Sequence, residues 1–203
     1  MTLLEALCVL LVIFMMLLML RPALVGPRKS PAIRCLNNLK NIGLAFRIYA
    51  TDHQDRFPLA SVFTNGAVDE ARVRPCHQYY RALSNYLSYP RLLICPGSEK
   101  KAAASFAALE GGNLTYLAGL VENAADPALI LAGDTHLLIR GVPVKAGVVN
   151  LSGAPNVEWN PKYEFHAGYG YFVNADGSVQ RLTAPRFRDQ FTNSSATELL
   201  LFP

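Results

Sequence analysis

The sequence is poor in charged residues, which make up 17% of its 203 positions, against about 25% in an average soluble domain. A disordered chain combines high charge with little apolar content, whereas 51% of these residues are hydrophobic, so disorder is excluded. The formal net charge of +4 is small and dispersed, which argues against a nucleic-acid partner. Internal repeats and low-complexity tracts are also missing. The composition indicates an ordinary globular core.

Motifs of the common catalytic and nucleotide-binding sites are missing as well. The chain has no G-x-S-x-G nucleophile elbow, no P-loop and no dinucleotide fingerprint. We therefore expect a protein that is not an enzyme.

One long apolar run stands at the N-terminus. Residues Ala6–Leu20 are apolar without interruption, and Glu5 is the only charged residue before Arg21. Counted from the first residue, a helix of about twenty residues rises about 30 Å, the thickness of the hydrocarbon core of a bilayer. The run lacks the basic start and the small-residue cleavage site of a secretory signal peptide. We expect a retained membrane-spanning helix over residues 1–20.

Glu5 is the odd residue of this segment, because a carboxylate beside an apolar span is costly without a partner. Two interpretations are open. Glu5 either has a functional partner, or it is an interfacial acid stabilised by the positive end of the helix dipole.

The start of the chain, Met1-Thr2-Leu3-Leu4-Glu5 followed by the apolar run, resembles the mature N-terminus of type IV pilins and type II secretion pseudopilins. The resemblance implies that Met1 is a processed and methylated terminus, unless the start codon is placed too late. It also implies that Glu5 pairs with the terminal amine of a neighbouring subunit, with Thr2, Leu3 and Leu4 at the same contact. Lysine and arginine after the span would place the globular part in the cytoplasm. The resemblance implies instead a single pass of the bacterial inner membrane and a periplasmic domain.

Prolines follow the apolar run closely. Pro22, Gly26, Pro27 and Pro31 all fall within residues 21–31. Each proline removes a backbone donor and clashes with the preceding turn. We therefore expect the helix to break between Pro22 and Pro31, and the chain to divide into residues 1–31 and a globular domain, 32–203.

An amphipathic helix is predicted after the break, over residues 32–52. Its apolar side chains recur at intervals of three and four residues, which places them on one face: Ile33, Leu36, Leu39, Ile42, Gly43, Phe46 and Tyr49 or Ala50.

Shorter patterns follow this helix. Residues 76–87 and 98–109 have helical periodicity, and apolar runs bounded by Gly, Asp or Pro predict strands at 92–95, 114–120, 128–132, 136–139 and 142–149. Asp-Gly between residues 169–173 and 178–182 indicates a hairpin. The predicted fold class is α+β, with the amphipathic helix packed on an antiparallel sheet in the manner of pilins.

Two further motifs resemble a subgroup of pilin-like proteins common in planctomycetes and verrucomicrobia. One is CLNNLKNIGLAFRIYATDHQDRFP, and the other is a histidine followed after nine residues by Asp-Gly. The resemblance implies other pilin subunits as partners in a homopolymer, together with a prepilin peptidase and an assembly ATPase with its membrane platform. The signature positions are Cys35, Asn38, Leu39, Gly43, His166, Asn174, Asp176 and Gly177.

Three cysteines lie beyond the apolar run and would be oxidised in an exported domain. Spacing favours a disulfide between Cys76 and Cys95, because a helix from residue 77 carries the chain about 18 Å away and the extended residues that follow can return. The pilin-like subgroup has cysteines at the positions of Cys35 and Cys95, so that pairing stays open, as do three free thiols. Cys8, within the apolar run, is a small hydrophobic residue.

Metal ligands are present, although not at the usual spacings. Imidazole and carboxylate groups suit zinc or iron, but no two of the candidates are spaced like the histidines of H-x-x-x-H. We therefore prefer a His166 that packs on strands and an Asp176-Gly177 that makes a turn, and we expect no resident metal. The transition-metal candidates are Asp134, His136, His166 and Asp176; weak calcium candidates, on oxygen chemistry alone, are Asp52, Asp55, Asn174 and Asp176.

The leading functional hypothesis is a structural subunit of a type IV pilus-like or type II secretion pseudopilus filament. The alternative is a membrane-tethered monomer that binds an exported protein or polysaccharide through an aromatic platform. A weaker third hypothesis is a metal hydrolase built on His136 and His166. The aromatic residues available to a platform are Tyr79, Tyr80, Tyr86, Tyr89, Trp159 and Tyr163.

Overall fold

The computed structural model describes the chain except for residues 1, 25–29, 65–66, 152–155, 164–165, 167 and 194–198. The chain divides into two units, Met1–Ser30 and Pro31–Pro203. The first unit holds helix α1 (Leu3–Leu24) and the second holds all other elements. Each unit is described by itself.

Helix α1 is apolar on every side and exposed on every side. Its large apolar side chains from Leu3 to Met19 are 46–89% exposed. No helix in the described part of the chain has the length and apolar content needed to cross a membrane. This finding corrects the prediction of a membrane-spanning helix over residues 1–20, and with it the single-pass inner-membrane location with a periplasmic domain. The uninterrupted run Ala6–Leu20 rises only about 22 Å as a helix, less than the roughly 30 Å of a hydrocarbon core.

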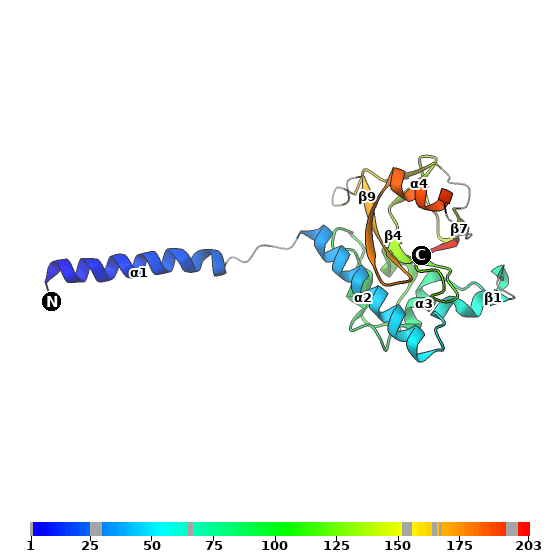
Figure 1. The fold of residues 1–203 in the computed structure, drawn as a ribbon, viewed down its shortest axis with the longest axis horizontal. Helices are drawn as coiled ribbons and strands as arrows, with labels where there is room; N and C mark the ends of the chain where they lie inside the picture. The colour runs from blue at the N-terminus through cyan, green and yellow to red at the C-terminus, as the bar shows by residue number, and fades with distance from the viewer. Residues whose placement is uncertain are drawn as a thin grey trace. The chain divides into compact units, whose positions relative to one another are not determined.

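The two long helices are separate. Helix α1 ends at Leu24 and α2 (Pro31–Asp52) begins at Pro31 (Figure 1). The end of α1 and the start of α2 fall within the predicted interval from Pro22 to Pro31, although Pro22 itself still lies inside α1. Proline removes one internal hydrogen bond and disfavours further helix, and α1 ends two residues after Pro22. Gly26 and Pro27 lie outside the described residues.

The architecture of the second unit is α+β with antiparallel sheets. Its main sheet has the strand order β10–β9–β4–β3–β11–β7, and all neighbouring strands are antiparallel. The strands are β3 (Tyr116–Gly119), β4 (Ile130–Asp134), β7 (Gly147–Asn150), β9 (Tyr169–Asn174), β10 (Val179–Thr183) and β11 (Leu199–Phe202).

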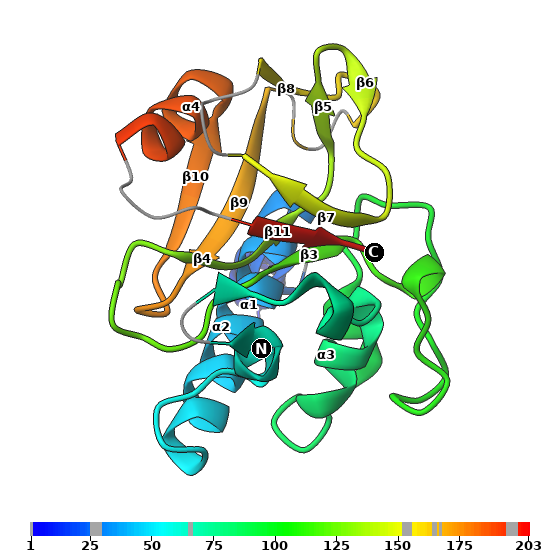
Figure 2. The ribbon, with the colours of Figure 1, turned by 90° about the vertical axis from the view of Figure 1, so that its right-hand side faces the viewer.

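Both faces of the main sheet are covered. Alternate residues of a strand point to opposite faces, so Tyr116 and Ala118 of β3 join the core under α2, whereas Leu117 joins the core on the other face. Helix α3 (Cys76–Ala82) packs on the α2 side. Helix α4 (Ala184–Asn193) and a small sheet in the order β6–β5–β8 cover the opposite side (Figure 2). The remaining short elements are η1 (Pro58–Val62), β1 (Phe63–Thr64), β2 (Ala67–Val68), η2 (Glu70–Arg72), η3 (Pro90–Leu93), η4 (Gly111–Asn113), β5 (Leu137–Ile139), β6 (Val142–Pro143) and β8 (Val157–Trp159).

Helix α2 packs on the main sheet through the predicted stripe, except at its start. Ile33 is 46% exposed, and Cys35 takes its place in the core. Since Ile33 lies in the first turn, it precedes the region that the sheet covers. The buried face consists of Cys35, Leu39, Ile42, Gly43, Ala45, Phe46 and Ala50.

Some predicted local elements are confirmed and others are wrong. Strands β9 and β10 form the predicted hairpin, with Gly177 at a φ of +86° in its turn. Residues 92–95 are not a strand, since Pro90 starts the 3-10 helix η3. Residues 98–109 do not form a helix, because the hydroxyls of Ser98 and Ser105 accept backbone hydrogen bonds two and three residues ahead, which competes with helical pairing.

Candidate functional site

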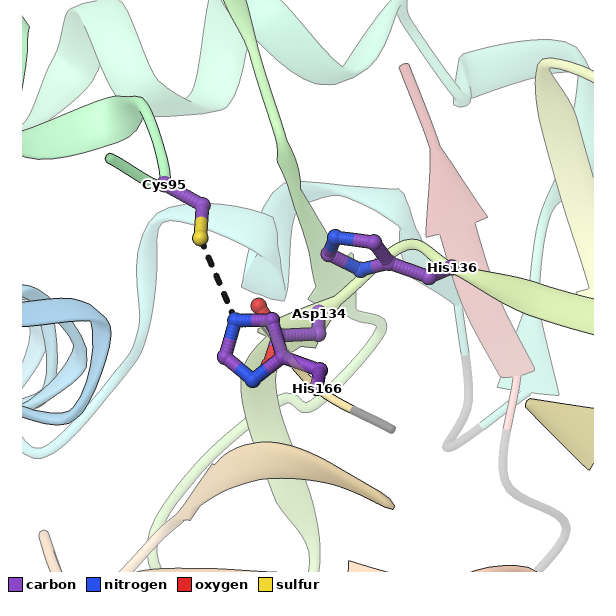
Figure 3. Close-up of side chains that lie close together, drawn as sticks. All are labelled: Cys95, Asp134, His136 and His166. Atoms are coloured by element: carbon purple, nitrogen blue, oxygen red, sulfur yellow. Dashed lines mark hydrogen bonds between the residues drawn. The ribbon is translucent and has the colours of Figure 1, made fainter. Parts of the chain in front are cut away.

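Four side chains that can bind a metal converge inside the second unit (Figure 3). They are Cys95, Asp134, His136 and His166, and each offers one ligand atom within 4.8 Å of the others. All four are at most 6% exposed. We call these four residues the buried cluster.

Hydrogen bonds to Thr115, which stands just before β3, hold two segments of the buried cluster together. The amide and hydroxyl of Thr135 both donate to the carbonyl of Thr115, at 3.3 and 3.0 Å. The amide of Cys95 donates to the hydroxyl of Thr115. Asp134, at the end of β4, and His136, two residues on, are therefore fixed beside Cys95.

His166 reaches the cluster from the segment before β9. Its amide donates to the carbonyl of Tyr163 at 3.0 Å, and its ring packs edge-on against Tyr169 and Tyr171, each with a centroid separation of 5.7 Å. The predicted packing of His166 on strands is thus confirmed. Its Nε2 lies 3.2 Å from Sγ of Cys95, a contact that sequence spacing did not indicate.

The polar atoms of the buried cluster are only partly satisfied. Asp134 Oδ2 accepts a hydrogen bond from the amide of Tyr171 at 2.8 Å. Within the described residues, Oδ1 of Asp134 and Nδ1 of both histidines are buried without a hydrogen-bond partner. Buried polar atoms of native proteins are paired in the great majority of cases, so these three atoms need an explanation.

Burial also shifts the protonation of the buried cluster. It raises the pKa of Asp134 to about 7, against the opposing effect of the Tyr171 amide. Burial, followed by the nearby His166 and Lys100, lowers the pKa of His136 to about 3. Burial lowers the pKa of His166 as well. Both imidazoles are therefore neutral at pH 7, the form in which histidine binds metals.

Cys95 is joined to Cys35 by a disulfide, with a Cα–Cα distance of 5.2 Å. The predicted Cys76–Cys95 pairing is wrong, and the bond formed is the pairing that the family resemblance left open. Cys76 is a buried free thiol at the start of α3, in the core beside Ala118. Helix α2 brings Cys35 to the segment of Cys95, where Asn38 donates to the carbonyl of Ile94 at 3.0 Å.

Asp176 does not belong to the buried cluster, and its predicted turn role is confirmed. Its Oδ1 accepts the amide of Ser178 at 2.7 Å, and hydrogen bonds from the Ser178 hydroxyl and amide hold the pKa of Asp176 below its usual value. Asn174 is buried beside this turn, at the end of β9. Asp52 accepts the hydroxyl of Tyr86 at 3.1 Å, and Asp55 has a φ of +57°. In the part of the chain that the structure describes, the calcium candidates Asp52, Asp55 and Asp176 join no group of three metal-binding side chains.

Leu39 and Gly43, the remaining signature residues, belong to the packed face of α2. Leu39 is fully buried, and a Cβ at Gly43 would collide with Cγ2 of Val173. Gly43 therefore permits the close approach of α2 to β9.

Three of the six rings named for the aromatic platform of the tethered-monomer hypothesis are buried and cannot contribute to a binding surface. Tyr79, Tyr80 and Trp159 are buried, and the hydroxyl of Tyr80 donates to the carbonyl of Leu117 at 2.8 Å. These rings pack in the two cores and present no shared surface.

At the start of α1, Glu5 caps its own helix. Its carboxylate accepts the amide of Thr2 at 2.9 Å, and the hydroxyl of Thr2 accepts the amide of Glu5 at 3.4 Å, a reciprocal pair of the capping-box kind. Leu3 and Leu4 are 89% and 72% exposed. Met1 lies outside the described residues.

Comparison of the whole chain with protein-family models, curated proteins and solved structures found no match. Its function is therefore argued from its own residues.

Sequence reasoning named three members of the buried cluster and missed Cys95. The spacing Asp134-x-His136 was an available signal, because alternate residues of an extended segment face the same side. Nothing in the spacing of Cys95 points to these residues, since the contact depends on how the sheet folds.

Proposed function

We propose that the chain is a structural subunit of a pilus-like or pseudopilus filament, in which the α1 helices of successive copies pack together in the filament core. The globular unit then forms the outer surface. A prepilin peptidase and an assembly ATPase with its platform are the partners that the resemblance to pilins implies.

The observation that supports this proposal is the exposed apolar surface of α1. Contiguous apolar patches of more than a few hundred Å² are rare on monomers and mark interaction sites. Every described side chain of α1 is exposed, and apolar residues occupy all sides of the helix. A groove would cover one side of such a helix, whereas a bundle of identical helices covers every side, so copies of α1 are the occupant that fits best.

Glu5 would fix how far neighbouring α1 helices are shifted along one another. Within a bundle of α1 helices its carboxylate loses water, and an unpaired buried charge is strongly destabilising. The terminal amine of a neighbouring copy would supply the opposite charge. Among the residues that the structure describes, the carboxylate is hydrogen-bonded to the first turn of its own helix, through the amide of Thr2, and it would exchange that bond for the ion pair.

The proposal predicts that Glu5→Gln lowers filament yield at least about tenfold, because the neutral amide cannot form the ion pair. The measurement is the amount of sheared filament relative to total protein at equal expression, in cells that carry the assembly machinery. Glu99→Gln removes an exposed carboxylate from the globular unit and serves as the matched control, with yield unchanged. Equal yields for the two variants, or no filament from the unaltered chain, would contradict the proposal.

Cys8 provides a second readout within the same experiment. Its thiol is exposed in the single chain and would be buried among helices in the filament. Alkylation should therefore label Cys8 in dispersed subunits and spare it in filaments, whereas a monomeric binding protein would be labelled in every fraction.

A further inference from the structure

We propose that the buried cluster binds one Zn²⁺ ion, and that it does so only while the Cys35–Cys95 disulfide is open. The sulfur atom of Cys95 then has two alternative partners, the sulfur of Cys35 in the disulfide or the metal ion.

The first argument is the set of ligand atoms. One thiolate, two imidazole nitrogens and one carboxylate oxygen make a four-ligand set of the kinds that bind zinc tetrahedrally in structural sites. The four atoms come from three chain segments and lie within 4.8 Å of one another. In a tetrahedral site, bond lengths of about 2.0–2.3 Å place ligand atoms roughly 3.3–3.5 Å apart. Side-chain rotations that move the ligand atoms by about an ångström would bring them to that spacing.

The second argument is the unmet bonding capacity of these side chains. Asp134 Oδ1 and Nδ1 of both histidines are buried without a partner among the described residues. An unpartnered buried polar group costs about 1–3 kcal/mol. A metal ion that takes an oxygen of Asp134 and one nitrogen from each ring removes part of that cost, and it orients the rings.

The third argument is charge. A divalent cation with one thiolate and one carboxylate is electrically neutral, which suits a site from which water is largely excluded. Removing one of the two anions would leave a net positive charge, and Lys100, bonded to the carbonyl of Leu114 at 2.7 Å, adds a nearby cation. The thiolate of Cys95 is therefore essential to the site.

This requirement excludes the disulfide. In the oxidised chain Cys95 Sγ is bonded to Cys35 Sγ and cannot be a thiolate ligand. A dithiol reductant opens the bond by forming its own disulfide, and each cysteine sulfur gains a proton. Zinc then displaces the proton of Cys95 to the solvent, so the metal step involves no oxidation or reduction.

The cluster also has a route for the ion. A cavity of about 170 Å³ borders His136, and its wall includes Lys100, Asn160 and Tyr163. Tyr163, whose ring is 4.1 Å from that of His136, is 37% exposed.

The test uses the full chain in a mild non-ionic detergent, with Cys8→Ala throughout to remove the exposed thiol. Cys35→Ala leaves the thiol of Cys95 permanently free. Titration with Co²⁺, a spectroscopic substitute for zinc, should show one ion per chain and a near-ultraviolet thiolate charge-transfer band, which Zn²⁺ then abolishes. Cys35→Ala with Cys95→Ser should lose the band. The matched control, Cys35→Ala with Cys76→Ala, removes the other buried thiol and should keep it.

Chains with both Cys35 and Cys95 provide a second route that does not depend on the folding of Cys35→Ala. With the disulfide intact they should bind Co²⁺ at least about 100-fold more weakly and without the charge-transfer band. A phosphine reductant, which takes up the oxygen of a water molecule while both sulfurs gain protons, should restore binding. The proposal is overturned if the reduced chain and Cys35→Ala both fail to bind, if the band survives Cys95→Ser, or if the oxidised chain binds as tightly as the reduced one.

Discussion

At the scale of single residues, Cys76 shows how strongly the core controls chemistry. It is a free thiol that is 2% exposed. Burial raises its pKa to about 12, against smaller opposing effects of the Ala118 backbone and Lys100. The thiolate is the reactive form of cysteine, so Cys76 is inert in the folded chain. Because its thiol is protected in this way, a third cysteine can lie in the same domain as the disulfide without exchanging with it.

The raised pKa of Cys76 predicts a loss of stability at high pH. The pKa of Cys76 in the folded chain lies above its value in the unfolded chain. The stability that the buried neutral thiol contributes is therefore fully present below about pH 9 and is lost as the pH rises toward 12. Between pH 8 and pH 10 the free energy of unfolding should fall by about 1 kcal/mol more in the unaltered chain than in Cys76→Ala. Urea titrations of both proteins at the two pH values measure the difference. An equal fall in both would show that Cys76 ionises as easily in the folded state as in the unfolded state.

At the scale of elements, the contact between α2 and β9 depends on a missing side chain. A Cβ at Gly43 would overlap Cγ2 of Val173, a residue with no exposed surface. Overpacking of this kind costs about 1–3 kcal/mol, whereas alanine is favoured over glycine in a helix by about 1 kcal/mol. Because the overlap would be with a side chain that has no room to move, we expect the steric effect to be the larger of the two.

We predict that Gly43→Ala lowers the free energy of unfolding by up to about 2 kcal/mol. In a Val173→Ala background the same change should be neutral or stabilising, because the obstructing methyl group is gone. Urea denaturation of the four proteins in this double-mutant cycle gives the coupling. Identical effects of Gly43→Ala in both backgrounds would mean that the two residues do not meet.

The elements that sequence reasoning located are those with a local cause. The periodicity of residues 32–52 fixes the buried face of α2, and Asp176-Gly177 fixes the hairpin turn. Residues 92–95 were misassigned because a short apolar run is equally buried as a strand or as a 3-10 turn. Strand β11 (Leu199–Phe202) gains its structure from β3 and β7 on either side, which no local pattern reports.

The buried cluster was harder to predict for the same reason at a longer range. Asp134 and His136 are two residues apart, but Cys95 and His166 come from segments that only the folded sheet brings together. The predicted disulfide partner of Cys95 was wrong for the same reason. The length of chain between Cys76 and Cys95 would allow those two residues to pair, but the packing of α2 against η3 places Cys35 beside Cys95.

At the scale of the whole molecule, the chain consists of an apolar helix and a unit with its own cores. Among the described residues, both core clusters consist of side chains from Cys35 onward. We predict that residues 30–203, which keep the residue before α2, unfold cooperatively at the same urea midpoint as the full chain. Parallel urea titrations followed by tryptophan fluorescence at Trp159 would test this. A lower midpoint or a broadened transition in the shortened chain would show that α1 contributes to the stability of the globular unit.

The position of the disulfide also decides how the globular unit responds to tension. A pull between the two ends of the chain enters this unit at Pro31 and meets Cys35 almost at once, within the second turn of α2. The force then passes through the sulfur bridge to Cys95 and bypasses the intervening residues, a sequence separation of 60. Those residues, which include most of α2 and all of α3, cannot be drawn out while the bridge is closed. Opening it would add up to about 200 Å of extensible chain, so the redox state of one bond sets the length to which this subunit can be stretched.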